Sequence, residues 1–146
     1  SRLHRALVEE DGLAISVSGH QSDCFDAGLA YFALTLAPGA DIAAAEARLR
    51  AEIQSVATDG VSASELAKAR NLRLAACWRG LQTINGKASA LGNFEVFRGD
   101  YETLFDVPGQ LNEITAAQLR AVAAKVFRDE NMTVGILSAP AQEEQE

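Results

Sequence analysis

Apolar and polar residues alternate in two stretches near the start of the chain, a pattern typical of half-buried β-strands. In residues 13–18, Leu13, Ile15 and Val17 alternate with small or polar side chains. Residues 29–38, LAYFALTLAP, alternate in the same way until their proline. The segment between the two stretches is longer than a two-residue turn, so we expect an antiparallel hairpin with a rather loose register.

Elsewhere the apolar residues recur every three to four positions, which predicts amphipathic helices. Two helix starts are marked by capping boxes, in which two side chains three residues apart each bond the other residue's backbone N–H. One box pairs Ser62 with Glu65, and the other pairs Thr115 with Gln118. The predicted helices cover residues 1–12, 41–60, 62–83, 86–99, 101–114 (a weak one, interrupted by Pro108 and Gly109) and 115–127.

A last alternating stretch, residues 131–140, predicts a third strand. The order helix, strand, strand, several helices, strand favours an α+β fold, with an antiparallel sheet and helices packed on one of its faces. The 146 residues are enough for one domain, and the acidic end at 141–146 is expected to be disordered. Three strands are few for so many helices, so part of the sheet is expected to be missing.

Charge and hydropathy argue against a nucleic-acid surface and a membrane span. The formal net charge is −7 at pH 7, which argues against a nucleic-acid surface, because such a surface needs clustered Lys and Arg facing phosphates. No apolar run approaches the roughly 18 residues that would predict a membrane span.

The chain offers few candidates for metal or nucleophilic chemistry. A zinc site needs about three converging ligands, and His4, His20 and Cys24 do not have a spacing that predicts one. We therefore expect no metal site and two solvent-facing histidines. Cys77 lies in an apolar helical stretch, so we expect no bond between Cys24 and Cys77. A catalytic triad assembled only in space stays open, but no G-x-S-x-G elbow or phosphate-binding loop is present.

Three consecutive acids, Glu9, Glu10 and Asp11, follow the first predicted helix. We interpret them as solvated side chains on the outer side of a helix end, where they oppose the helix dipole by a few tenths of a kcal/mol. They are not expected to form a catalytic pair. The residues by themselves therefore indicate a non-catalytic soluble domain.

Several segments together resemble one family. "SRLHRALVEEDGLAISVSG" is similar to a hallmark of the C-terminal domain of pitrilysin-type (insulinase-like, M16) zinc metallopeptidases and mitochondrial processing peptidase, S-R-L-x-x-x-L-R-E-x-x-G-L-A-Y-S-V. The resemblance continues in the strand and helix around "LTLAPGADIAAAEARLRAEIQSVATDGVSASELAKARNLRLAA". It extends to "GKASALGNFEVFRGD", "EITAAQLRAVAAKVF" and "NMTVGILSAP". These segments occur in family order over nearly the whole chain.

The resemblance implies a processing-peptidase-like sheet covered by helices. It also implies that residues 1–140 are a partial C-terminal M16-type domain, lacking its first strand and helix. In this family the zinc and the general-base Glu come from an H-x-x-E-H motif in the N-terminal half or a partner subunit. No such motif is present here, so no metal ligand and no catalytic residue is carried over.

The resemblance also implies a role in substrate contact for two positions of this chain. Many family members have an Arg and a Tyr seven residues apart, which reach across a chamber to the substrate peptide. Those positions are Val8 and Ile15 here. Neither side chain can donate a hydrogen bond to a substrate carbonyl or an oxyanion. They are therefore expected to be substrate-facing positions that have lost their polar groups.

We expect a non-catalytic domain that closes a peptide-digesting chamber opposite a zinc-bearing H-x-x-E-H domain. Its partners would be that N-terminal M16 domain, in a two-chain version a second M16 subunit, and a peptide substrate. The alternative is an inactive, scaffolding M16 homologue, and a third reading is an unrelated α+β binding module. The compartment is not readable from the residues, although the resemblance slightly favours the bacterial periplasm.

Overall fold

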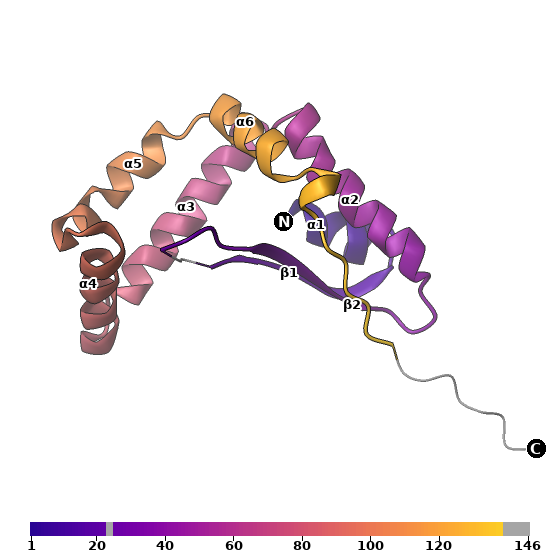
Figure 1. The fold of residues 1–146 in the computed structure, drawn as a ribbon, viewed down its shortest axis with the longest axis horizontal. Coiled ribbons are helices and arrows are strands. Elements are labelled where there is room, and N and C mark those ends of the chain that lie inside the picture. The colour runs from indigo at the N-terminus through magenta and orange to yellow at the C-terminus, as the bar shows by residue number, and fades with distance from the viewer. Residues whose placement is uncertain (23–24, 139–146) are drawn as a thin grey trace, which may run out of the picture.

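An antiparallel hairpin lies beneath an arch of helices in the computed structural model, which describes residues 1–22 and 25–138 (Figure 1). The arch and the hairpin together form the α+β arrangement expected from the sequence, with the helices on one side of the sheet. The elements are α1 (Arg2–His4), the π-helix η1 (Arg5–Glu10), β1 (Ala14–Gln21), β2 (Ala30–Leu36), α2 (Ile42–Thr58), α3 (Ala63–Gly80), α4 (Ile84–Arg98), the 3-10 helix η2 (Tyr101–Asp106), α5 (Val107–Glu113), α6 (Ala116–Val126) and the 3-10 helix η3 (Asp129–Asn131).

The register of the hairpin puts its two faces in different surroundings. Val17 pairs with Leu34, and Gly19 pairs with Phe32, so these residues share one face. The ring of Phe32 lies 5.9 Å from that of Phe127, just beyond α6, which places this face against the helices. Phe32 and Leu34 are half-buried, whereas Tyr31 on the other face is exposed.

Both predicted capping boxes are present. The hydroxyl of Ser62 accepts from the backbone N–H of Glu65, and the Glu65 carboxylate accepts from the N–H of Ser62. Thr115 and Gln118 make the same reciprocal bonds at the start of α6. These side chains satisfy N–H groups that a helix start leaves without intrahelical partners, so the two boundaries follow from local sequence.

Two expectations about the later helices need correction. Pro108 does not interrupt a helix; it lies in the first turn of α5, where a missing N–H costs nothing. The helix expected at 86–99 begins earlier, because Thr83 caps it and accepts from the N–H of Gly86 at 3.0 Å. Gly86 also faces the carbonyl of Gly80 so closely that any Cβ there would overlap that oxygen.

The third strand expected at 131–140 is wrong for residues 132–138, which pair with no other described strand. The first N–H of this segment, that of Met132, bonds to the carbonyl of Asp129 in the preceding turn. Val134 and Ile136 are exposed. Alternation in sequence marks which side chains would face a core, but a strand forms only where a second strand completes its ladder. Residues 139–140 and the acidic end at 141–146 lie outside the described residues.

The buried core is small and unevenly divided. Its larger part lies where η1, β1, α2 and α6 meet, and Leu7 is its one fully buried large side chain among the described residues. Leu104 is the single buried residue described in the arm formed by α3, α4, η2 and α5. The buried hydrophobic residues described are Ala6, Leu7, Ala14, Ala45, Leu104 and Ala123.

The chain is correspondingly open. It exposes 10963 Å², whereas a compact protein of this mass exposes about 7,200 Å². Any ten residues in a fully extended conformation would account for only about 1,600 Å² of this difference. An excess of roughly 2,000 Å² over a compact protein would therefore remain. Among the described residues, no helix combines the length and the apolar character that a membrane crossing requires.

Candidate functional site

The predicted substrate-facing position Val8 lies in a π-helical turn. The chain enters this turn directly from α1, and the N–H of Asp11 closes it by donating to the carbonyl of Ala6 at 3.0 Å. Leu7 is wholly buried here, while Val8 is half-buried. Gly12 ends the turn in the left-handed region, at φ 61°, as its position after the predicted helix suggested. Single π-turns are rare and occur often at functional sites.

The second predicted position, Ile15, is the extra residue of a β-bulge. Ala14 pairs with Leu36, and the next paired residue, Ser16, faces Thr35, so Ile15 has no partner on β2. Its side chain is 61% exposed. A bulge bends its strand and re-aims a side chain, and bulges are common beside active sites. Both predicted positions thus stand on irregular backbone, although both side chains are apolar.

The acids that follow Val8 are exposed, but all three form ion pairs, two of them with a residue distant in the sequence. Asp11 and Glu10 form ion pairs with Arg48 of α2, at 2.8 and 3.4 Å. Arg48 also lies 3.3 Å from Glu52, one turn further along α2. Glu9 lies 3.2 Å from the imidazole of His4. Glu10 and Asp11 therefore fasten the π-turn to α2.

A second arginine fixes the other end of this region. The guanidinium of Arg2 donates to both carboxylate oxygens of Glu65, at 3.0 and 3.1 Å, and to the hydroxyl of Ser55 at 2.7 Å. The backbone N–H of Ser62, and then the Arg2 guanidinium, lower the pKa of Glu65 to about 2. Glu65 thus serves the capping box of α3 and the ion pair at once. Neither arginine was singled out from sequence, because the carboxylates that join them to other elements, Asp11 and Glu65, lie 37 and 63 residues away.

No described group of three or more His, Cys, Asp or Glu side chains could hold a metal ion. His4 is engaged with Glu9, and the ring of His20 lies 5.4 Å from that of Tyr31 on the hairpin. Cys77 is half-buried in α3 with a free thiol. Cys24 lies outside the described residues, so its expected lack of a bond to Cys77 stays a prediction.

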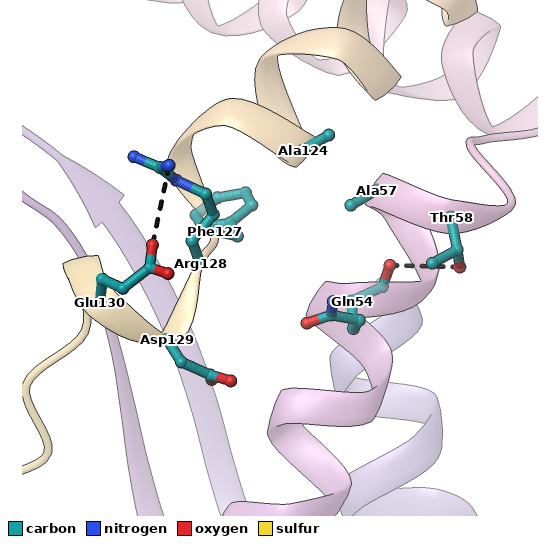
Figure 2. A pocket seen from close by; sticks show the side chains of 8 residues that line it. All are labelled: Gln54, Ala57, Thr58, Ala124, Phe127, Arg128, Asp129 and Glu130. Carbon is teal, nitrogen blue, oxygen red and sulfur yellow. Dashed lines mark hydrogen bonds and ion pairs between the residues drawn. The ribbon is translucent and has the colours of Figure 1, made fainter.

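A hollow of about 360 Å³ lies between α2 and the end of α6 (Figure 2). Each of its charged side chains has an ion-pair partner. Arg128 lies 3.6 Å from Glu130, and Asp129 lies 3.2 Å from Arg50. The Thr58 hydroxyl donates to the carbonyl of Gln54 at 3.3 Å. The hollow is lined by Gln54, Ala57, Thr58, Ala124, Phe127, Arg128, Asp129 and Glu130, a set without a His or Cys nucleophile.

Comparison with known proteins decides the family. Residues 1–73, half of the chain, match the family described as the peptidase M16 inactive domain. The chain belongs to the peptidase M16 family. The matching residues include the π-turn, the bulged hairpin and α2, so the M16 resemblance seen in the sequence is confirmed.

Relatives agree with this assignment. The M16 chain is 24% identical over 133 residues to the uncharacterised zinc protease YmxG of Bacillus subtilis (strain 168). That match covers 89% of this chain and 32% of YmxG, so the chain spans about a third of that relative's length.

Solved structures of two relatives have the same fold. One is the inactive peptidase domain of a candidate zinc protease from Bordetella parapertussis, at 28% identity and a TM-score of 0.82, covering 98% of this chain and 78% of that one. The other is a candidate zinc protease from Bordetella pertussis Tohama I, at 30% identity and a TM-score of 0.76, covering 91% of this chain and 72% of that one.

Proposed function

We propose that this M16 inactive domain is the non-catalytic C-terminal half of a zinc metalloendopeptidase. In this proposal it closes a peptide-digesting chamber, and an N-terminal M16 domain with an H-x-x-E-H motif supplies the zinc. The match of residues 1–73 to the inactive-domain family carries the proposal.

The surface near Val8 and Ile15 is the part of this half that would face the substrate. Two backbone irregularities present these residues, as expected of positions shaped for contact and not only for packing. Their side chains supply van der Waals contact and no hydrogen-bond donor. Polarisation of the scissile carbonyl would therefore come from the zinc-bearing half alone.

The large exposed surface of the chain supports its packing against another domain. The exposed surface exceeds that of a compact protein by roughly 2,000 Å². Each partner in a standard protein–protein interface buries only about 800 Å², so the excess is large enough to supply such an interface. We further propose that the chain is a partial domain, completed by a strand and a helix. Their addition would extend the two-stranded sheet by a third strand.

The test is metal analysis and peptide cleavage by the full-length protein, compared with this chain alone. We expect about one zinc per full-length protein, cleavage of unstructured peptides, and loss of both after alanine replaces the H-x-x-E-H histidines. The chain alone should contain no stoichiometric zinc and cleave nothing. Zinc bound by this chain and removed by His20→Ala would overturn the proposal.

A scaffolding role is the second candidate, favoured by the apolar character of Val8 and Ile15. It predicts a full-length protein, or a complex, that assembles without zinc and cleaves no peptide. The same measurements therefore separate the two functions.

A further inference from the structure

Positive charge is concentrated on one part of an otherwise acidic chain. Residues 66–94 contain five basic side chains and no Asp or Glu. The other residues hold eight basic and twenty acidic side chains, a net charge of −12. The basic stretch is most of α3, the following turn and the first half of α4, within the arm at the left of Figure 1.

Most basic side chains outside this stretch form ion pairs, although Arg98, Arg120 and Lys125 form none with a described residue. Arg2, Arg5, Arg48, Arg50 and Arg128 each lie within ion-pair distance of a carboxylate. The exposed side chains of the basic stretch make no ion pair with any described residue; they are Lys68, Arg73, Arg79 and Lys87.

Apolar side chains flank these cations on α3. At 100° per residue, Lys68 and Arg79 fall between Leu72 and Trp78 around the helix. Leu72 is 59% exposed and Trp78 is 56% exposed. Since α3 buries no side chain within this chain, this surface is unpartnered.

The first half of α4 repeats the arrangement. Ile84, 88% exposed, and the exposed Lys87 share a face with Leu91. Leu91 also lines a shallow hollow of about 410 Å³, together with Gly92, Glu95 and Tyr101. The Glu95 carboxylate is engaged there, since it accepts from the backbone N–H of Tyr101 at 3.1 Å. We call the exposed residues Lys68, Leu72, Trp78, Arg79, Ile84 and Lys87 the α3–α4 face.

We propose that the α3–α4 face docks onto an acidic surface of the N-terminal M16 domain, which would also carry apolar side chains. This rests on the proposed function, because it names where the two halves meet. Covering Leu72 and Trp78 also removes water from the cations between them. A desolvated cation is costly unless a carboxylate lies opposite, so the partner must supply acids at these positions.

A protein surface fits this face better than a lipid surface. The net charge of −12 on the other residues opposes approach to an anionic membrane. The hollow between α4 and η2 can accept a side chain from a shaped partner.

The experiment is hydrogen exchange in the full-length protein, followed in peptides from α3 and α4. We expect slow exchange at residues 66–87, which 0.5 M NaCl should accelerate, because the interface depends on charge. Lys68→Glu with Arg79→Glu should accelerate exchange there about tenfold. Arg120→Glu with Lys125→Glu makes the same charge change on exposed cations of α6 and should leave α3 unaffected. If the double Glu variant fails to fold, Lys68→Gln with Arg79→Gln tests the same contact.

Several results would overturn the proposal. Equal effects of the test and control pairs would do so, as would exchange of α3 as fast as in this chain alone. Binding of this chain to phosphatidylglycerol vesicles that Lys68→Glu with Arg79→Glu abolishes would also overturn it. A concentration-dependent dimer of this chain, lost in the same variant, would also overturn it in favour of a second copy. If zinc and cleavage are present while α3 exchanges fast, only the docking face is wrong. If zinc and cleavage are absent, the proposed function is wrong.

Discussion

The guanidinium of Arg48 lies 2.8 Å from the carboxylate of Asp11, and this ion pair joins α2 to the end of the π-turn that carries Val8. Glu10 and Glu52 also lie within ion-pair distance of Arg48. One cation thus serves three acids. The acidic run that looked merely solvated in the sequence therefore holds the π-turn that carries Val8 against α2.

Replacing Arg48 by Met should destabilise the fold. The change removes a cation shared by three carboxylates and leaves those acids to repel one another. Exposed pairs contribute about 0.2–1 kcal/mol each, so we expect a loss of about 1 kcal/mol in urea unfolding. The loss should shrink in 0.5 M NaCl. Lys125→Met, on an exposed cation without a described ion pair, is the control; an equal loss there would show that Arg48 has no special role.

Glu65 should make stability depend on acid pH. Its folded pKa, about 2, lies below the ordinary value of 4.5, so its charged form stabilises the fold above pH 4.5. That contribution should disappear as pH falls from about 5 to 2. The side chain is 41% exposed, so solvent screens its charge, and we expect only about 1 kcal/mol. The measurement is the free energy of unfolding of the wild type and of Glu65→Gln between pH 7 and 2. The two proteins should become equally stable as the pH approaches 2. A difference in stability between the two proteins that does not change with pH would contradict the prediction.

Local sequence predicted the parts of the fold that local chemistry decides. The pair Ser62 and Glu65 defines a helix start within four residues, and the structure has that start. The bulge at Ile15 was not predictable, because strict alternation through Leu13, Ile15 and Val17 gives no sign of an extra residue. Residues 132–138 alternate equally well but have no described strand beside them. The hydrogen-bond ladders between strands and the long-range ion pairs depend on which segments meet in space, so a local pattern does not predict them.

Two glycines of α4 should respond oppositely to alanine. A Cβ at Gly86 would overlap the carbonyl oxygen of Gly80, so Gly86→Ala must displace the start of the helix and should cost about 1–3 kcal/mol. A Cβ at Gly92 meets nothing within 4 Å, so Gly92→Ala should stabilise by about 0.5–1 kcal/mol. Urea unfolding of both variants tests the pair. Equal responses would show that the turn between α3 and α4 is looser than the contact with Gly80 implies.

Restoring the polar pair, Val8→Arg with Ile15→Tyr, should leave this chain folded. Ile15 is the exposed residue of a bulge, and Val8 is only half-buried, while the neighbouring Leu7 fills the core. Substitutions at exposed positions usually change stability by about 0.5 kcal/mol or less, which corresponds to a few degrees in melting temperature. Leu7→Arg is the matched control, because it puts a charge into the core and should abolish cooperative unfolding.

Thermal unfolding of the two variants tests whether Val8 and Ile15 lie on the surface or in the core. A fall of more than about 10 °C in the double variant would mean that Val8 and Ile15 belong to the core and not to a substrate-facing surface. If the double variant stays folded, the same pair in the full-length protein becomes informative. An arginine and a tyrosine at these positions add hydrogen-bond donors beside a bound peptide, so KM for an unstructured peptide should change. An unchanged KM would show that the two positions do not face the substrate, because side chains of such different size and polarity alter any contact they make.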